Sequence, residues 1–470
     1  MTNRLCFSEH GEGKTKLLVS TTAQRTGRTS IDTVAERWAF RRWSFDYQKM
    51  YYKELHKALE EAIGQPPPLH GVGAGTGPSR TSSASIETAG DLRRILLSDT
   101  GIDKVLALEE LAVPTTVDLL HTEIRATAMK PSLSEYRVRC RKCLKALVNT
   151  HHILPASLFV NEVGKDGTHP LAGGGFSDLE ERAKDIWKGT YGEESVCLKV
   201  LRIHIQGDRR KRAKVAEAFY KETLLWTQLS HPNLLPFTGV NTTLFPHGFC
   251  LVSPWMANGD IVTFLALHPD HEKLTVILEI AGGMAYLHGL KIVHGDIKGA
   301  NVLVDEQGRC RLADFGLAVI AAESTELNNS SASSAKGSLR WMAPEVFNVC
   351  GGAVISNNGE RGKRRTIKLA RDIYAFACTV LEIITGKPPF PDLIDAMVMF
   401  QVAVHDSRPP RPTNVIWCPS NIWALMQQCW TRQAQDRPEA SEIHDFLSLL
   451  ENLRRAGSPW EHVSPDILLS

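Results

Sequence analysis

The chain has 470 residues, of which 43% are hydrophobic and 23% are charged, and its formal net charge at pH 7 is +2. This length exceeds a single folding unit and the composition is that of an ordinary globular protein, so two or three units are expected. The small net charge gives no reason to expect nucleic acid or an anionic membrane as the principal partner. The sequence has no run of about 18 apolar residues, and its start lacks the apolar segment of a signal peptide, so no membrane span is expected.

The first 86 residues are predicted to form a flexible region with one helix. Residues 1–35 are polar and without periodicity. Apolar side chains recur near helical spacing over residues 38–63, which predicts a helix there. Residues 65–85 are rich in Pro, Gly and Ser, and they are interpreted as a linker.

Residues 87–165 form a second N-terminal region, for which the sequence predicts helices. One apolar stripe begins near Leu92, and another runs from Leu133 to Val148. Pro114 and Pro131 interrupt the pattern, which predicts about three short helices. The sequence leaves open whether these helices form a module of their own or pack on the back of the domain that follows.

The ten cysteines of the chain are scattered, which favours reduced thiols and an intracellular, cytoplasmic protein. Cys140 and Cys143 have the spacing of a metal-binding pair, but no second pair follows. His151 and His152 are adjacent in sequence rather than spaced to converge on one ion. We therefore interpret the two cysteines as part of a buried helix face and expect no zinc site.

The pattern then changes to strands up to about residue 256 and to helices as far as residue 455. One strand pattern, Val196–Leu201, carries a single lysine, Lys199, among apolar neighbours. A buried lysine is costly unless it is paired. The sequence therefore predicts an anionic partner for Lys199.

Two polar motifs lie close together between Ile292 and Gly316. The first, residues 294–301, places a carboxylate, an amine and an amide in one short loop, and the second, Asp314-Phe315-Gly316, adds a carboxylate after an apolar run. Phosphoryl transfer needs a carboxylate to orient and deprotonate a hydroxyl, a cation on the moving phosphate and oxygen ligands for Mg²⁺. The two motifs together indicate this chemistry.

In these residues and in their spacing the chain resembles the protein kinase family. The resemblance extends to Trp341-Met-Ala-Pro-Glu345 and to Asp436-Arg437-Pro438, which stand in the expected order. The closing motif is similar to that of serine/threonine kinases of the tyrosine-kinase-like group, and the phrasing of the chain resembles the expanded fungal members of that group.

The resemblance implies an α+β fold with two lobes over residues 166–455. A small antiparallel β lobe with one helix is expected over residues 166–256, and a larger, mainly helical lobe over residues 257–455. Residues 456–470 are then expected to form a tail.

The resemblance also assigns catalytic roles. Asp296 would be the catalytic base, and Lys298 would hold the γ-phosphate of ATP. Asn301 and Asp314 would ligate Mg²⁺. Asp372 would cap the loop that carries these residues, although such an Asp is also a common helix N-cap.

For the nucleotide, the resemblance implies that Lys199 contacts the phosphates and pairs with Glu222. Ser253, Pro254 and Met256 match the segment that joins the lobes and binds adenine. Pro254 is acceptable there because its carbonyl can still accept a hydrogen bond.

The phosphate-covering loop departs from the family pattern. Its expected nucleotide-binding residues are Gly173, Gly174, Gly175, Phe176 and Ile186. The seven residues Leu179–Asp185 separate the turn from Ile186, which is expected over the adenine, and they must bulge out or break the hairpin. We interpret them as a lineage-specific insertion or an error in the predicted coding sequence, and reads of the transcript decide between these.

Gly295 precedes the expected base, where most kinases have an arginine that pairs with a phosphorylated activation loop. Without that arginine, activity is predicted not to depend strictly on phosphorylation of that loop. The hydroxyl side chains concerned are Thr325, Ser330, Ser331, Ser333 and Ser334.

The resemblance thus implies an enzyme of intracellular signalling, a protein serine/threonine kinase with ATP and Mg²⁺ as cofactors and proteins as substrates. The alternative is a pseudokinase or scaffold that binds nucleotide or protein partners without efficient transfer, which the interrupted loop favours. A small-molecule phosphotransferase is disfavoured because the closing motif and Arg437 serve peptide substrates. The sequence predicts no nucleic-acid partner, and it leaves the substrate, the upstream regulator and the oligomeric state open.

Overall fold

A computed structural model of the chain describes residues 86–109, 112–127, 130–151, 153–173, 184–202, 209–245, 248–315, 319–320, 337–347, 361–413, 415 and 417–465. The predicted N-terminal helix and the linker lie outside these residues. So do Gly174, Gly175 and Phe176 of the glycine-rich segment and the five hydroxyl residues of the activation loop.

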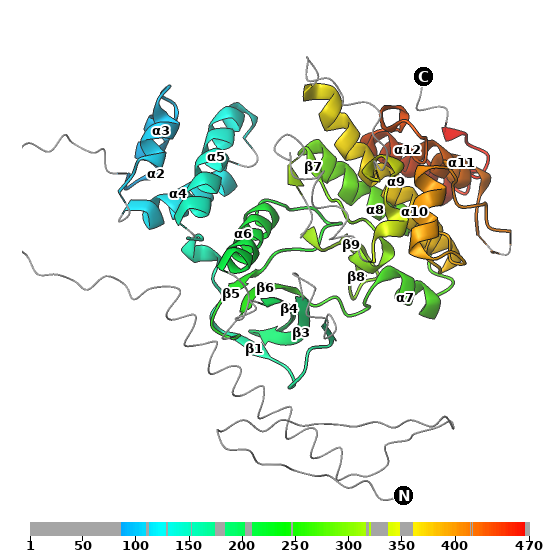
Figure 1. Cartoon of the computed structure of the whole chain (residues 1–470), viewed down its shortest axis with the longest axis horizontal. Coiled ribbons are helices and arrows are strands. Elements are labelled where there is room, and N and C mark those ends of the chain that lie inside the picture. The colour runs from blue at the N-terminus through cyan, green and yellow to red at the C-terminus, as the bar shows by residue number, and fades with distance from the viewer. Residues whose placement is uncertain are drawn as a thin grey trace, which may run out of the picture. The chain divides into compact units, whose positions relative to one another are not determined.

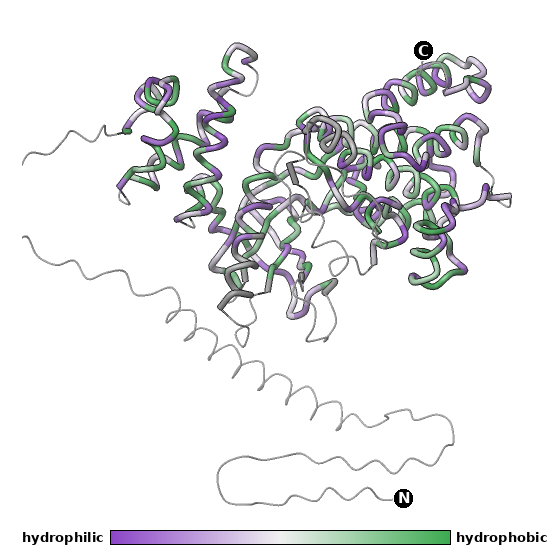
Figure 2. The backbone as a smooth tube through the Cα atoms, turned by 45° about the horizontal axis from the view of Figure 1, so that its top comes forward, coloured by the Kyte–Doolittle hydropathy of each residue, from purple (hydrophilic) through white to green (hydrophobic). Residues whose placement is uncertain are grey.

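The described chain begins with four helices (Figure 1). They are α2 (Ala89–Leu96), α3 (Gly101–Leu106), α4 (Val113–Ala126) and α5 (Ser134–His151), with 3-10 turns η2 (Pro131–Leu133) and η3 (Ala156–Leu158). The tube alternates between hydrophobic and hydrophilic along these helices, as expected for amphipathic helices with one buried face (Figure 2). Pro114 lies in the first turn of α4, where the missing N–H costs nothing.

These helices bury apolar side chains against one another. Leu92, Leu120 and Leu144 are fully or almost fully buried, and so are Cys140 and Cys143, as the sequence predicted. Among the described residues no cluster of His, Cys, Asp or Glu is arranged to hold a metal ion.

The helical region also contacts the small lobe. Helix α5 contacts α6 (Arg209–Trp226). Asp118 on α4 accepts a hydrogen bond of 2.6 Å from the backbone N–H of Ala156, and Val160 N–H donates one of 2.9 Å to Val240 O. The four helices therefore have a shared core and are also tied to the sheet that follows.

The small lobe is an antiparallel sheet with the strand order β1-β3-β4-β6-β5, and β2 pairs with β3. The strands are β1 (Val163–Lys165), β2 (Ala172–Gly173), β3 (Lys184–Tyr191), β4 (Glu194–Arg202), β5 (Gly239–Asn241) and β6 (Gly248–Pro254). The β3–β4 hairpin turns at Gly192, whose φ of 60° favours glycine.

One expectation about the hairpin needs correction. Lys184 and Asp185, predicted to bulge out or break it, are regular residues of β3 and pair with Leu201 and Val200 of β4. Asp185 also pairs with Gly173 of β2. The inserted stretch therefore extends the strand at its C-terminal end, because backbone pairing to β4 continues there whatever the side chains are.

The large lobe is mainly helical and carries short strand pairs (Figure 1). Its helices are α7 (Ile261–Leu267), α8 (Lys273–Gly289), α9 (Arg361–Thr385), α10 (Asp395–Ala403), α11 (Ser420–Cys429) and α12 (Ala440–Arg455). Its strands are β7 (Ile292–Val293), β8 (Val302–Val304), β9 (Cys310–Leu312) and β10 (Val319–Ile320), with turns η4 (Gly299–Asn301), η7 (Leu339–Trp341), η8 (Pro344–Val346) and η9 (Ala434–Asp436). Strand β7 pairs with β10, and β8 with β9.

Helix α9 forms the centre of this lobe. Its residues from Asp372 to Ile384 are all buried, which is the pattern of a helix covered on every side. Polar side chains on this stretch therefore need internal partners, and Asp372 and Glu382 are two of them.

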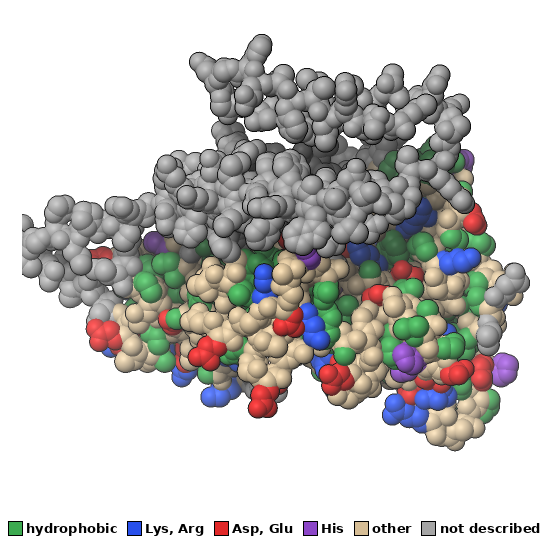
Figure 3. Space-filling view, turned by 90° about the horizontal axis from the view of Figure 1, so that it is seen from below, with side chains coloured by type: hydrophobic (Ala, Val, Ile, Leu, Met, Phe, Trp, Pro, Cys, Tyr) green, Lys and Arg blue, Asp and Glu red, His purple; other side chains and the backbone are tan. Residues whose placement is uncertain are grey.

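No described helix combines the length and the apolar character needed to cross a bilayer. Acidic and basic side chains are interspersed on the face shown in Figure 3, which agrees with the small net charge of the chain.

Candidate active site

Asp372 on α9 fixes the loop of residues 294–301 from below. Its carboxylate accepts hydrogen bonds from His294 N (2.7 Å), Gly295 N (2.9 Å) and His288 Nε2 (3.0 Å). Burial favours a higher pKa, but the hydrogen bonds from His288 and from the backbone hold the pKa of Asp372 below its usual range. Gly295 has a φ of 81°, which other residues rarely adopt, so the loop needs glycine here.

Within this loop, Asp296, Lys298 and Asn301 form one hydrogen-bonded cluster. Lys298 Nζ lies 3.0 Å from Asp296 Oδ2, and Asn301 Nδ2 donates to the same oxygen at 2.8 Å. The other oxygen, Asp296 Oδ1, is buried and has no hydrogen-bond partner among the described residues. It is the atom left to accept a hydrogen bond from a bound hydroxyl.

Lys199 on β4 meets two carboxylates from distant parts of the chain. Its Nζ lies 2.5 Å from Glu222 Oε1 on α6 and 2.8 Å from Asp314 Oδ1. Burial alone lowers the pKa of a lysine, but Asp314 and Glu222 outweigh it and raise the pKa of Lys199. The anionic partner that the sequence predicted is present.

A row of aromatic rings connects α6 with the 294–301 loop. Phe315 is buried, and its ring centroid lies 5.6 Å from that of Trp226 and 5.5 Å from that of His294. Ala313 N also donates to Asn301 O at 2.8 Å. These contacts bring the Asp314 segment, α6 and the loop into one packed unit.

One face of the small-lobe sheet carries the expected nucleotide-binding side chains. Ile186 pairs with Lys199, and Ser253 pairs with Cys197, which is two residues before Lys199 on the same strand. Because opposite residues and alternate residues of a strand share a face, Ile186, Lys199 and Ser253 point the same way. Met256 follows β6 and is buried. Pro254 ends β6, and Gly173 ends β2.

Residues 337–345 lie against the 294–301 loop. Lys298 Nζ donates to Ser338 Oγ at 2.6 Å, and Trp341 Nε1 donates to Glu382 Oε2 at 3.0 Å. Arg340 donates to the carbonyl oxygens of Pro389, Phe390 and Leu393 and to Asp395 Oδ1. Each of these contacts anchors the segment at a different point of the large lobe.

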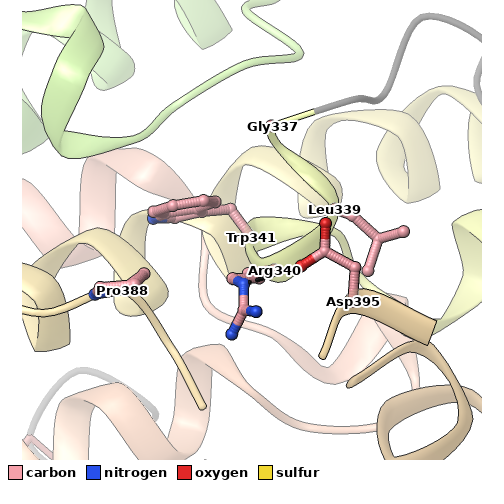
Figure 4. A pocket seen from close by; sticks show the side chains of 6 residues that line it. All are labelled: Gly337, Leu339, Arg340, Trp341, Pro388 and Asp395. Atoms are coloured by element: carbon pink, nitrogen blue, oxygen red, sulfur yellow. Dashed lines mark hydrogen bonds and ion pairs between the residues drawn. The ribbon is translucent and has the colours of Figure 1, made fainter. Parts of the chain in front are cut away.

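Beside this segment lies a pocket of about 170 Å³, lined by Gly337, Leu339, Arg340, Trp341, Pro388 and Asp395. Trp341 and Pro388 lie on one side and Leu339 and Asp395 on the other, with Arg340 between them (Figure 4). The pocket thus lies on the stretch that also supplies Ser338.

The residues present fit Mg²⁺ and a nucleotide. Asp314 offers a carboxylate, and because Asn301 Nδ2 donates to Asp296, the amide oxygen of Asn301 is the atom left for a metal ion. Mg²⁺ prefers such oxygen ligands.

Sequence reasoning missed two elements of the site, Glu382 and the Trp226–Phe315–His294 row. Glu382 could have been found, because it is the single charged residue between Ile373 and Thr385 in the printed sequence. The aromatic row had no sequence signal, since its members come from three separate segments.

Comparison with known proteins places the chain in a family. The model for protein tyrosine and serine/threonine kinases matches residues 169–447. Serine/threonine/tyrosine-protein kinase HT1 of Arabidopsis thaliana is 28% identical over 279 residues, which cover 58% of this chain and 65% of the relative. Mitogen-activated protein kinase kinase kinase 5 of the same plant is 32% identical, with coverage of 57% and 36%. Serine/threonine-protein kinase TNNI3K of Homo sapiens is 30% identical, with coverage of 55% and 29%.

The chain therefore belongs to the protein tyrosine and serine/threonine kinase family, and the predicted two-lobed α+β fold is confirmed. The relatives also agree with the predicted tyrosine-kinase-like group. The resemblance to fungal members stays a prediction. The chain spans less than two thirds of the length of each of these relatives.

Proposed function

We propose that the chain is an ATP-dependent protein serine/threonine kinase. The observation that carries the proposal is the convergence of two clusters: Lys199 with Glu222 and Asp314, and Asp296 with Lys298 and Asn301. Phosphoryl transfer depends on positioning and on charge stabilisation, and these clusters supply both.

The proposed mechanism is an in-line displacement. Asp296 Oδ1 accepts the hydrogen of the substrate hydroxyl and takes its proton as the new P–O bond forms and ADP leaves. Lys298 and Lys199 stabilise the charge of the phosphates, and Glu222 keeps Lys199 in place. Mg²⁺, held by Asp314 and Asn301 when bound, bridges the phosphates and neutralises charge on them.

The remaining assignments belong to the same proposal. Gly173, Gly174, Gly175 and Phe176 cover the phosphates, Ile186 lies over the adenine, and Ser253, Pro254 and Met256 contact its edge. Lys298 and the closing motif favour serine and threonine over tyrosine. The proposal also includes an intracellular signalling role, which the free thiols of all eight described cysteines support.

A second candidate is a scaffold that binds nucleotide without efficient transfer. The interrupted glycine-rich segment favours it, since β2 contributes only Ala172 and Gly173 to the sheet before the described chain stops. The intact Lys199–Glu222 pair supports the enzyme instead, because a scaffold does not need a lysine poised for phosphate.

Incubation with γ-labelled ATP, Mg²⁺ and a generic basic protein tests the proposal. We expect label in phosphoserine and phosphothreonine after acid hydrolysis of the product. Nucleotide must also raise the melting temperature of the chain, because a ligand that binds the folded state stabilises it by mass action. A thermal shift without transfer supports the scaffold, and label only in phosphotyrosine contradicts the serine/threonine assignment.

A further inference from the structure

Glu382 is a buried carboxylate that no catalytic role above uses. Its side chain lies on α9, and only 8% of the residue is exposed. Burial raises the pKa of Glu382, and the hydrogen bonds that it accepts from Gly299 and Trp341 act in the opposite direction. A buried carboxylate is costly without donors, so these two donors are part of the fold.

The first donor belongs to the 294–301 loop. Gly299 N donates to Glu382 Oε2 at 2.8 Å. A Cβ at Gly299 would lie 2.9 Å from that oxygen and 2.5 Å from Val262 Cγ2, so only glycine allows this approach. Gly299 directly follows Lys298, and fixing its N–H therefore fixes the backbone from which the Lys298 side chain extends.

The second donor belongs to residues 337–345. Trp341 Nε1 donates to the same oxygen, Glu382 Oε2, at 3.0 Å. Trp341 N also donates to Ser338 O at 3.1 Å, so Trp341 and Ser338 belong to one tight turn. Ser338 Oγ in turn accepts from Lys298 Nζ at 2.6 Å.

The four contacts close a ring. It runs from Glu382 through Gly299 and Lys298 to Ser338, and through Trp341 back to the same carboxylate oxygen. The 294–301 loop and residues 337–345 are thus joined twice, once by Lys298 with Ser338 and once by Glu382. Lys298 is free to leave Ser338 for a phosphate only if the second connection keeps the two segments together.

We propose that Glu382 is a positioning residue that holds residues 337–345 against the 294–301 loop while Lys298 acts on phosphate. It touches neither substrate nor nucleotide. This role rests on the proposed kinase function, in which residues 337–345 receive the protein substrate and Lys298 contacts the γ-phosphate. A loss of the connection therefore weakens use of the peptide more than use of ATP.

The test compares the full-length chain with Trp341→Phe, which removes the indole N–H and keeps an aromatic ring beside the pocket. The substrate is a peptide that contains the site labelled in the generic basic protein. We expect the KM for this peptide to rise about ten-fold, as for the loss of a hydrogen bond to a charged group, and the KM for ATP to change less than two-fold. Trp423→Phe is the matched control, since Trp423 lies on α11 and its indole N–H has no acceptor in the described part of the chain. It should change neither constant.

Glu382→Ala removes the acceptor for both donors and should raise the peptide KM further. The double variant with Trp341→Phe should be no worse than Glu382→Ala alone, because both remove one connection. Glu382→Gln keeps an acceptor oxygen and should recover most of the loss.

Amide hydrogen exchange keeps the proposal testable without turnover. In Trp341→Phe, exchange over residues 295–301 should be faster than in the wild-type chain, and exchange over α12 should be unchanged. Unchanged exchange over residues 295–301 overturns the role of Glu382, whether or not the wild-type chain transfers phosphate. Absence of transfer in the wild-type chain with faster exchange in the variant contradicts the proposed function and leaves the connection supported.

Discussion

Arg437 and Glu345 form a two-pronged ion pair in the large lobe, with Nη1 and Nη2 each 2.8 Å from a carboxylate oxygen. The Arg437 side chain is fully buried, and it also donates to Ala370 O and Thr431 O. The sequence predicted this pair from two distant motifs, and the structure confirms it. The pair anchors the end of residues 337–345 to the helices behind it.

Arg437→Ala should lower the free energy of unfolding by about 3–5 kcal/mol, because it leaves the partly buried Glu345 and two carbonyls without their donor. Urea denaturation measures this value. Arg432→Ala is the matched control, since Arg432 is 53% exposed and 3.4 Å from Asp406. It should cost less than about 0.5 kcal/mol. Equal losses in the two variants would show that the ion pair carries no special stability.

Deletion of the inserted residues Leu179–Asp185 should leave phosphate transfer intact and tighten nucleotide binding. The reason is that Asp178 then joins Ile186, and the strand residues Lys184 and Asp185 are replaced by Ser177 and Asp178, which continue the family pattern. Isothermal titration with ATP and Mg²⁺ measures the affinity. Weaker binding after deletion would show that the insertion is an integral part of the loop.

A variant with Ala at all five activation-loop hydroxyls should keep most of its transfer activity. Gly295 stands where an arginine would pair with a phosphate on that loop, and its φ of 81° disfavours any larger residue. Initial rates of label transfer for the variant and the wild-type chain test this. Loss of nearly all turnover would contradict the prediction.

The helical region should be destabilised by mild acid through His121 on α4. This side chain is 3% exposed, and its Nδ1 lies 3.3 Å from Ser157 Oγ. Burial lowers the pKa of His121 below 6.5, Arg125 acts in the same direction, and Asp118 opposes them. As the pH falls through about 6.5, the unfolded chain takes up a proton that the folded chain does not bind, so the free energy of unfolding falls until the folded pKa is reached.

Urea denaturation at pH 7.5 and pH 5 measures this effect as a difference between the wild-type chain and His121→Gln. The wild-type chain should lose more stability over this range, by up to about 1.4 kcal/mol for each pH unit between the two pKa values. His169→Gln, at an exposed position, should behave like the wild-type chain. Parallel losses in wild type and His121→Gln would contradict the burial argument.

Much of the catalytic domain was predictable because its signals are local. The lysine in an apolar strand, the polar loop at residues 294–301 and the closing motif each occupy a few consecutive residues. Their three-dimensional convergence, as between Lys199, Glu222 and Asp314, followed from the family resemblance rather than from spacing.

Other features were not predictable from the sequence for physical reasons. The continuation of β3 through Lys184 and Asp185 depends on backbone pairing with β4, which charged side chains do not reveal. The ring through Glu382 joins three segments, and a single glutamate in an apolar helix indicates a buried partner without naming it.

The most direct test of the central claim is the time course of label transfer from γ-labelled ATP by the wild-type chain and by Asp296→Asn. Asn keeps the shape of the side chain but cannot take a proton. The account predicts transfer by the wild-type chain, a fall of at least about 100-fold in the variant, and similar thermal shifts with nucleotide in both. Equal transfer rates would contradict the assignment of Asp296 as the base, and absence of transfer by the wild-type chain would contradict the kinase activity itself.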